Sequence, residues 1–201
     1  MKCCHILPDD YEKIKCFSFS ENKKLSYAVN AIALAVAALL VVPMLFVVPF
    51  DLLTVSSKSE AMEKFISGGV LLLLLISYIF LHEGVHGIFI RYISGKWGKF
   101  GFRSGFAYAS SEAFFGKREY VIIAAAPIVI LGIVVGIANM LVPSGWFWIV
   151  YMIQVVNISG AVGDAYVIYT ALKLPDDCLI KDDGLEVSVF AKTSAENINK
   201  E

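Results

Sequence analysis

The chain has 201 residues, of which 58% are hydrophobic and only 17% are charged, whereas soluble domains carry about 25% charged residues. The apolar residues gather in long blocks, which excludes an ordinary soluble fold and indicates helices that span a membrane. The formal net charge of −1 gives no sign of a nucleic-acid partner.

Four apolar stretches predict membrane-spanning helices, because each is long enough to cross a hydrocarbon layer about 30 Å thick. They lie near residues 26–50, 65–90, 120–142 and 146–172. Pro43 and Pro49 are expected to kink or end the first helix. The predicted fold class is therefore an all-α membrane protein.

Three parts of the chain follow from these spans. They are an N-terminal cytoplasmic segment (1–25), a membrane domain (26–172) and a cytoplasmic tail (173–201). The first 24 residues are polar and mixed in charge, unlike a cleaved signal peptide, so we expect the first span to be retained.

Lysine and arginine predict the orientation, because they gather in cytoplasmic segments. The N-terminal segment has five, the three loops have two, six and none in chain order, and the tail has four. This alternation predicts a multi-pass protein of the cell membrane with both termini in the cytoplasm and residues 51–64 outside. All four cysteines then lie on the cytoplasmic side, where a disulfide framework is not expected. The oligomeric state is left open.

The second loop contains FGFRSGFAYASSEAFF, in which aromatic residues and glycines nearly alternate. This pattern predicts one or two short strands or a hairpin at the membrane surface. An irregular aromatic loop anchored at the interface fits the pattern equally well. The tail sequence LEVSVF (185–190) predicts another short strand.

The second span carries the motif His82-Glu83-Gly84-Val85-His86. Two histidines four positions apart share one face of a helix, so both imidazoles can reach one zinc ion. The glutamate between them is the candidate general base for a water molecule. Charged and titratable groups inside a span are costly and are kept mainly for function. A polar cluster that only packs helices together is the alternative.

A catalytic zinc ion usually has three protein ligands, so the motif predicts one more. Asp164 is the best candidate, because it lies inside the fourth span. His82 precedes the first basic residue after its span by nine positions, and so does Asp164. At 1.5 Å per residue both lie roughly 13 Å from the cytoplasmic end of their helices. Glu112 and Glu119 remain possible ligands.

Other residues of the fourth span lie close to Asp164 in sequence. Asn157 lies on about the same helical face and is a candidate for binding the substrate backbone or a water molecule. Gln154 continues this polar face and is interpreted as a hydrogen-bonding contact between helices. Gly160 and Gly163 would let another helix approach closely.

These motifs together resemble a known family. The order HEGVH, FGFRSGFAYAS, AAAPIVI and NISGAVGDAY, within about residues 70–172, resembles a group of small prokaryotic membrane proteins described as zincin peptidases. It also resembles the intramembrane zinc metalloproteases of the site-2 protease type. Those enzymes place H-E-x-x-H in one span and an aspartate ligand in a later span, with a membrane-associated β segment between them that is thought to align substrate. They carry the aspartate as L-D-G, where this chain has Gly163-Asp164-Ala165.

The predicted function is zinc-dependent hydrolysis of peptide bonds in membrane-protein or peptide substrates, in or near the bilayer. His82, His86 and Asp164 would hold Zn²⁺, and Glu83 would be the catalytic base. A metal-binding membrane scaffold or regulator without turnover is the main alternative. An ion or proton pathway is the other alternative, although the chain lacks the repeat architecture typical of transporters.

Overall fold

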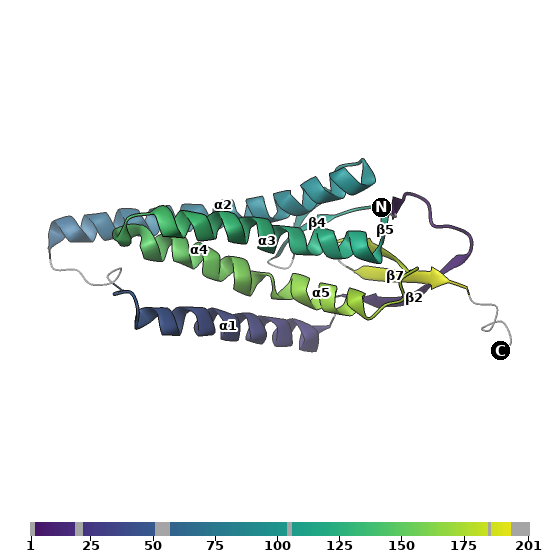
Figure 1. The fold of residues 1–201 in the computed structure, drawn as a ribbon, viewed down its shortest axis with the longest axis horizontal. Coiled ribbons are helices and arrows are strands. Elements are labelled where there is room, and N and C mark those ends of the chain that lie inside the picture. The colour runs from purple at the N-terminus through teal and green to yellow at the C-terminus, as the bar shows by residue number, and fades with distance from the viewer. Residues whose placement is uncertain (1–2, 19–21, 51–56, 104–105, 185, 194–201) are drawn as a thin grey trace. The chain divides into compact units, whose positions relative to one another are not determined.

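The computed structural model describes residues 3–18, 22–50, 57–103, 106–184 and 186–193, apart from the side chains of Arg103 and Phe106. Four segments of this part are helical, long and apolar enough to cross a membrane (Figure 1). They are α1 (Lys23–Leu45), α2 (Lys58–Ser94), α3 (Lys117–Leu141) and the segment Ser144–Leu172, which contains a short 3-10 turn (Ser144–Trp146), α4 (Phe147–Gly160) and α5 (Val162–Leu172). The protein is mostly helical, and its helices are compatible with a multi-pass membrane protein.

Side-chain caps begin two of these helices. The amide of Leu25 donates to Asn22 Oδ1 over 3.1 Å at the start of α1. The amide of Glu60 donates to Ser57 Oγ over 3.2 Å at the start of α2. Each oxygen accepts from an amide that has no partner within its helix. α2 ends at Ser94, and Gly95 follows with a φ of 75°, a left-handed conformation that glycine adopts without strain.

The fourth apolar segment is not one continuous helix. α4 ends at Gly160 and α5 begins at Val162, because Ala161 between them has a ψ of 9° that does not continue the helix. Gly160 and Gly163 do not mark the predicted close approach, since a Cβ at either would meet no described atom within 4 Å. The close contact is at Gly132 of α3, where a Cβ would lie 3.0 Å from Asn157 Nδ2.

The chain also forms more β structure than the short loop element expected within the predicted all-α class. An antiparallel hairpin joins β3 (Lys99–Arg103) and β4 (Phe106–Ser110), as the alternating aromatic loop predicts. A separate sheet has the strand order β1-β5-β6-β7-β2, and every pair in it is antiparallel. Its strands are β1 (Cys3–Cys4), β2 (Tyr11–Phe17), β5 (Phe114–Gly116), β6 (Leu179–Asp182) and β7 (Val187–Lys192).

This sheet brings together three segments that are far apart in sequence. β1 and β2 come from the N-terminal segment, β5 from the loop after α2, and β6 and β7 from the tail (Figure 1). The tail strand predicted over 185–190 corresponds to β7, although Leu185 lies outside the described residues. The N-terminal strand β2 had no counterpart among the predicted elements.

Backbone contacts divide the chain into two compact units. The first comprises Met1–Ala28, Glu83–Ala126 and Asp164–Glu201, and the second comprises Val29–His82 and Pro127–Gly163. The apolar core of the first unit joins residues of α2, α3, α5 and the sheet, among them Ile90, Ile123, Val167, Ile180 and Val189. The sheet thus packs against the helical segments that carry His86 and Asp164.

Candidate metal centre

His82 and His86 lie one turn apart on the continuous helix α2, so both imidazoles project from one side of it. His86 is buried and His82 is half-buried. Most of α2 carries apolar side chains. Placing two histidines one turn apart in such a helix costs free energy unless the imidazoles have polar or metal partners.

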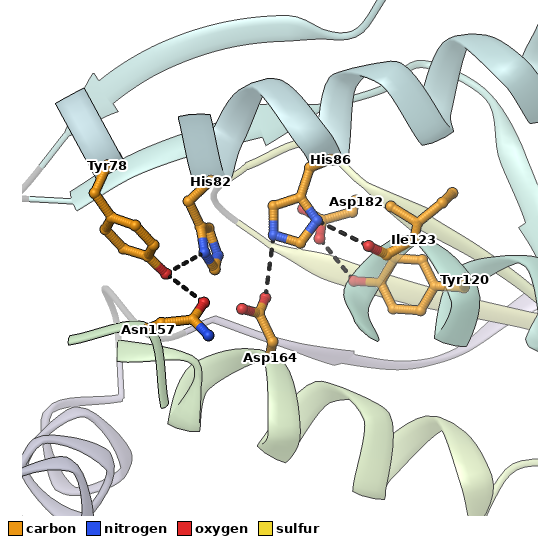
Figure 2. A network of polar contacts seen from close by, with 8 residues as sticks. All are labelled: Tyr78, His82, His86, Tyr120, Ile123, Asn157, Asp164 and Asp182. Atoms are coloured by element: carbon orange, nitrogen blue, oxygen red, sulfur yellow. Dashed lines mark hydrogen bonds and ion pairs between the residues drawn. The ribbon is translucent and has the colours of Figure 1, made fainter. Parts of the chain in front are cut away.

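His86 has a protein partner at each ring nitrogen. Its Nδ1 lies 2.9 Å from the backbone carbonyl of Ile123 in α3. A carbonyl can only accept a hydrogen bond, so Nδ1 carries the proton. The other nitrogen, Nε2, lies 3.5 Å from Asp164 Oδ1. Figure 2 shows the His86 ring between these two groups.

The contact between His86 Nε2 and Asp164 Oδ1 is favourable only if a positive charge lies on the imidazole or between the two groups. In neutral imidazole with the proton on Nδ1, Nε2 presents a lone pair, and the carboxylate oxygen presents another. Two such acceptors repel each other unless the imidazole takes a second proton or a cation lies between them. A metal ion would meet this requirement with both groups as ligands.

His82 completes a possible ligand set. One ligand atom from each of His82, His86 and Asp164 lies within 4.8 Å of the other two. Among the residues that the structure describes, one group of His, Cys, Asp or Glu side chains could hold a metal ion, and it consists of these three. Two imidazoles and one carboxylate are a donor set that zinc enzymes use while keeping one position open for water. The three side chains therefore fit a zinc ion.

His82 belongs to a second chain of hydrogen bonds. Its Nδ1 lies 2.9 Å from the Tyr78 hydroxyl, which also lies 2.9 Å from Asn157 Oδ1. Asn157 Nδ2 in turn donates to the carbonyl of Ile128 over 3.2 Å. Asn157 is fully buried and Tyr78 is 6% exposed. The predicted role of Asn157 in binding substrate stays a prediction, and the structure places its amide against Tyr78 and α3.

Glu83, the predicted base, directly follows His82 on α2 and is half-buried. It is close enough to His86 for an electrostatic interaction with that imidazole. Its carboxylate thus belongs to the same side-chain cluster without being one of the three possible ligands.

The two other candidate ligands lie elsewhere. Glu112 has a side chain that is 76% exposed and forms an ion pair with Lys99, which lowers the pKa of the carboxyl group. Glu119 is buried in the first turn of α3. Neither belongs to the group formed by the two histidines and Asp164.

Sequence reasoning missed several polar residues around the site. Tyr78 precedes His82 by four positions, and this helical spacing was a usable signal. Tyr120 and Asp182 gave no such signal, because Asp182 lies in tail strand β6. Tyr120 lies one turn before Ile123 on α3. Its hydroxyl donates to Asp182 Oδ2 over 2.7 Å. Burial raises the pKa of Asp182, against the effect of that hydrogen bond.

Comparison with known proteins adds one match. A family model described as "Putative zincin peptidase" matches residues 75–179, a range that contains the histidine motif and Asp164. No curated protein matches the chain. No solved structure matches it.

Proposed function

Because this chain belongs to that zincin peptidase family, we propose that it is a zinc-dependent peptidase that hydrolyses peptide bonds of membrane-associated substrates in or near the bilayer. One observation carries the proposal. His86 Nε2 and Asp164 Oδ1 face each other over 3.5 Å, and His82, the neighbour of Glu83, has a ligand atom within 4.8 Å of each. This arrangement favours a cation beside the carboxylate of Glu83, which would act as the base.

Each residue of the site then has a distinct role. His82, His86 and Asp164 would hold the ion, and zinc bound there would polarise the scissile carbonyl and acidify water. Glu83 would take a proton from the attacking water and pass it to the nitrogen of the leaving amine. His86 keeps its orientation through Ile123, and Asp164 would supply a negative charge that offsets part of the charge of the ion.

The surroundings of the site support a membrane-associated substrate. The site residues lie in two of the four apolar segments, Lys58–Ser94 and Ser144–Leu172, and the hairpin β3–β4 exposes Phe102. A helical substrate must unwind before its backbone can be cut. Strands of a hairpin offer backbone groups to an extended segment, which makes β3–β4 the docking element that we propose. We also propose that both termini are cytoplasmic.

Replacement of Glu83 tests the enzymatic function. Glu83→Gln keeps the size and most hydrogen bonding of the side chain but cannot accept the proton. We expect this variant to fold, retain zinc and cleave about 10²–10⁴-fold more slowly. Cleavage would be measured by co-expression with a panel of single-span membrane proteins, and metal content would be measured on purified protein.

His86→Ala is the matched control for the metal, and we expect it to lose both zinc and cleavage. If Glu83→Gln cleaves its substrate as fast as the wild type, the proposed role of Glu83 is wrong. If the wild type holds zinc, cleaves nothing in the panel, and has a cellular effect that survives Glu83→Gln undiminished, the protein is a metal-binding scaffold.

A further inference from the structure

The hydrogen bonds around His82 have a fixed direction, and the geometry points to a function for them. We propose that Tyr78 and Asn157 are positioning residues that hold the proton of His82 on Nδ1, so that Nε2 presents its lone pair to the metal ion. The inference rests on the proposed zinc site, and it concerns how that site is kept ready to bind.

The direction of the chain begins at Ile128. Its backbone carbonyl can only accept, so the Asn157 atom that faces it over 3.2 Å must be the donating Nδ2. The other end of this amide, Oδ1, therefore faces the Tyr78 hydroxyl over 2.9 Å. Since Oδ1 can only accept, the single hydroxyl proton of Tyr78 points to Asn157.

The next step fixes the tautomer of His82. The Tyr78 oxygen has already used its proton, so toward His82 it can only accept a hydrogen bond. His82 Nδ1, 2.9 Å from that oxygen, must therefore carry the proton. A neutral imidazole with its proton on Nδ1 has its lone pair on Nε2, and a zinc ligand must present such a lone pair. Figure 2 shows the Tyr78 hydroxyl between His82 and Asn157.

Burial makes this direction hard to reverse. Asn157 is fully buried and Tyr78 nearly so, and leaving one of their polar groups unsatisfied there would be costly. Gly132 keeps α3 close to this amide, because a Cβ at Gly132 would lie 3.0 Å from Asn157 Nδ2. Reversal would require the amide to turn and place Oδ1 against the Ile128 carbonyl.

The two histidines reach the same state by different means. His86 Nδ1 faces a backbone carbonyl, which no substitution removes. His82 Nδ1 faces a side chain whose direction depends on a second side chain. The tautomer of His82 can therefore be changed by a substitution at Tyr78 or Asn157, without replacing a metal ligand.

Zinc affinity is the first test, measured on purified protein by competition with a chelator. Removing the outer hydrogen-bond partner of a metal-binding histidine typically weakens metal binding about 10–100-fold, and we expect this loss for Tyr78→Phe. Tyr151→Phe is the matched control. The Tyr151 hydroxyl likewise donates a hydrogen bond, in this case to the backbone carbonyl of Leu40 over 2.9 Å, but it has no link to His82 among the described contacts. We expect this variant to keep wild-type zinc affinity.

A double variant separates positioning from packing. In Asn157→Leu the Tyr78 hydroxyl loses its acceptor and becomes free to donate to His82 Nδ1, which favours the tautomer that cannot bind zinc through Nε2. We therefore expect Asn157→Leu to bind zinc more weakly than the wild type. Adding Tyr78→Phe should restore part of the affinity, because the competing donor is gone. If the two residues only packed the helices, the double variant would bind zinc more weakly than either single variant.

A measurement on the unmutated fold covers the case in which these variants do not fold. ¹⁵N NMR of histidine-labelled, zinc-free protein distinguishes the tautomers, and removal of His5 and His86 in turn assigns the His82 signals. We expect a protonated Nδ1 and an unprotonated Nε2. The reverse tautomer, or equal zinc affinity in Tyr78→Phe, Asn157→Leu and Tyr151→Phe, would overturn the inference. Absence of zinc binding by the wild type would instead reject the proposed function, and the inference with it.

Discussion

Asp164 places a carboxylate in the first turn of α5, within the fourth apolar segment. Its oxygen faces the imidazole of His86. Because His86 is buried and Asp164 is half-buried, their mutual charge is important. An asparagine has nearly the same shape but carries no charge to balance a metal ion. The negative charge, more than the shape of the side chain, is therefore what the ligand assignment predicts to be necessary.

We expect Asp164→Asn to insert into the membrane, to bind zinc at least about 10-fold more weakly and to lose cleavage. Asp176→Asn is the control, because Asp176 is exposed and pairs with Lys117 outside the site. Metal content and cleavage would be measured for both. Stoichiometric zinc and wild-type activity in Asp164→Asn would reject the assignment, and Glu112 would be tested next.

The candidate site residues stand out in the sequence, because titratable residues are rare in its apolar stretches. Two of the three histidines lie in one motif, and Asp164 stands out in the fourth span. Equal distances from the next basic residue predict a common depth for His82 and Asp164. The hydrogen-bonding partners were harder to find, since Tyr120 and Asp182 are brought together only by tertiary folding. The roles of His82, His86 and Asp164 as ligands and of Glu83 as base remain predictions.

At the scale of elements, strand β3 approaches helix α2 through one glycine. A Cβ at Gly87 would lie 2.2 Å from Cζ of Phe100 in β3, which is too short for two carbon atoms that are not bonded to each other. Gly87 therefore lets the aromatic ring rest on the helix backbone directly after the histidine motif. The position of the hairpin relative to this part of α2 depends on that contact.

We expect Gly87→Ala to lower the free energy of unfolding by about 1–3 kcal/mol, the usual cost of overpacking, because Phe100 must move. Gly84→Ala is the matched control on the same helix, since a Cβ there meets no described atom within 4 Å. Alanine favours helix over glycine by up to about 1 kcal/mol, so this control should be neutral or more stable. Thermal unfolding in detergent would measure both. Equal destabilisation would show that the Phe100 contact is unimportant.

The helices were predictable as elements because long apolar stretches leave few alternatives. The five-stranded sheet was not, since its strands are two to seven residues long and pair across the whole chain. Tyr11–Phe17, for example, finds its partner in Val187–Lys192. No local pattern encodes such pairing. The break at Ala161 was also missed, because the sequence remains apolar through it.

At the scale of the whole molecule, the sheet constrains the topology. Hydrogen-bonded strands must lie on one side of a bilayer, and the sheet contains strands from the N-terminal segment, the loop after α2 and the tail. If the four apolar segments span the membrane, these three parts share a side. Both loops on the other side then carry few basic residues, two and none. The positive-inside rule therefore predicts that the sheet lies in the cytoplasm.

Thiol labelling of intact cells tests this orientation with a reporter on each side. Cys16 in β2 is exposed and reports on the sheet. Ser57, which is exposed at the start of α2, reports on the opposite side when replaced in the variant Cys16→Ser/Ser57→Cys. Residues 51–56 of the predicted external loop, and the tail from residue 194 on, lie outside the described residues.

A membrane-impermeant maleimide should label the Ser57→Cys variant in intact cells, because that thiol faces outward in the predicted topology. It should label Cys16 of the wild type only after the cells are permeabilised. Cys178 is fully buried, and β1 shares the sheet with β2, so the remaining native thiols should not label from outside. The reverse pattern would move the sheet to the external side. Labelling of both reporters in intact cells would contradict four spans, because only α1 lies between β2 and the loop before α2, and α1 would then not cross the membrane.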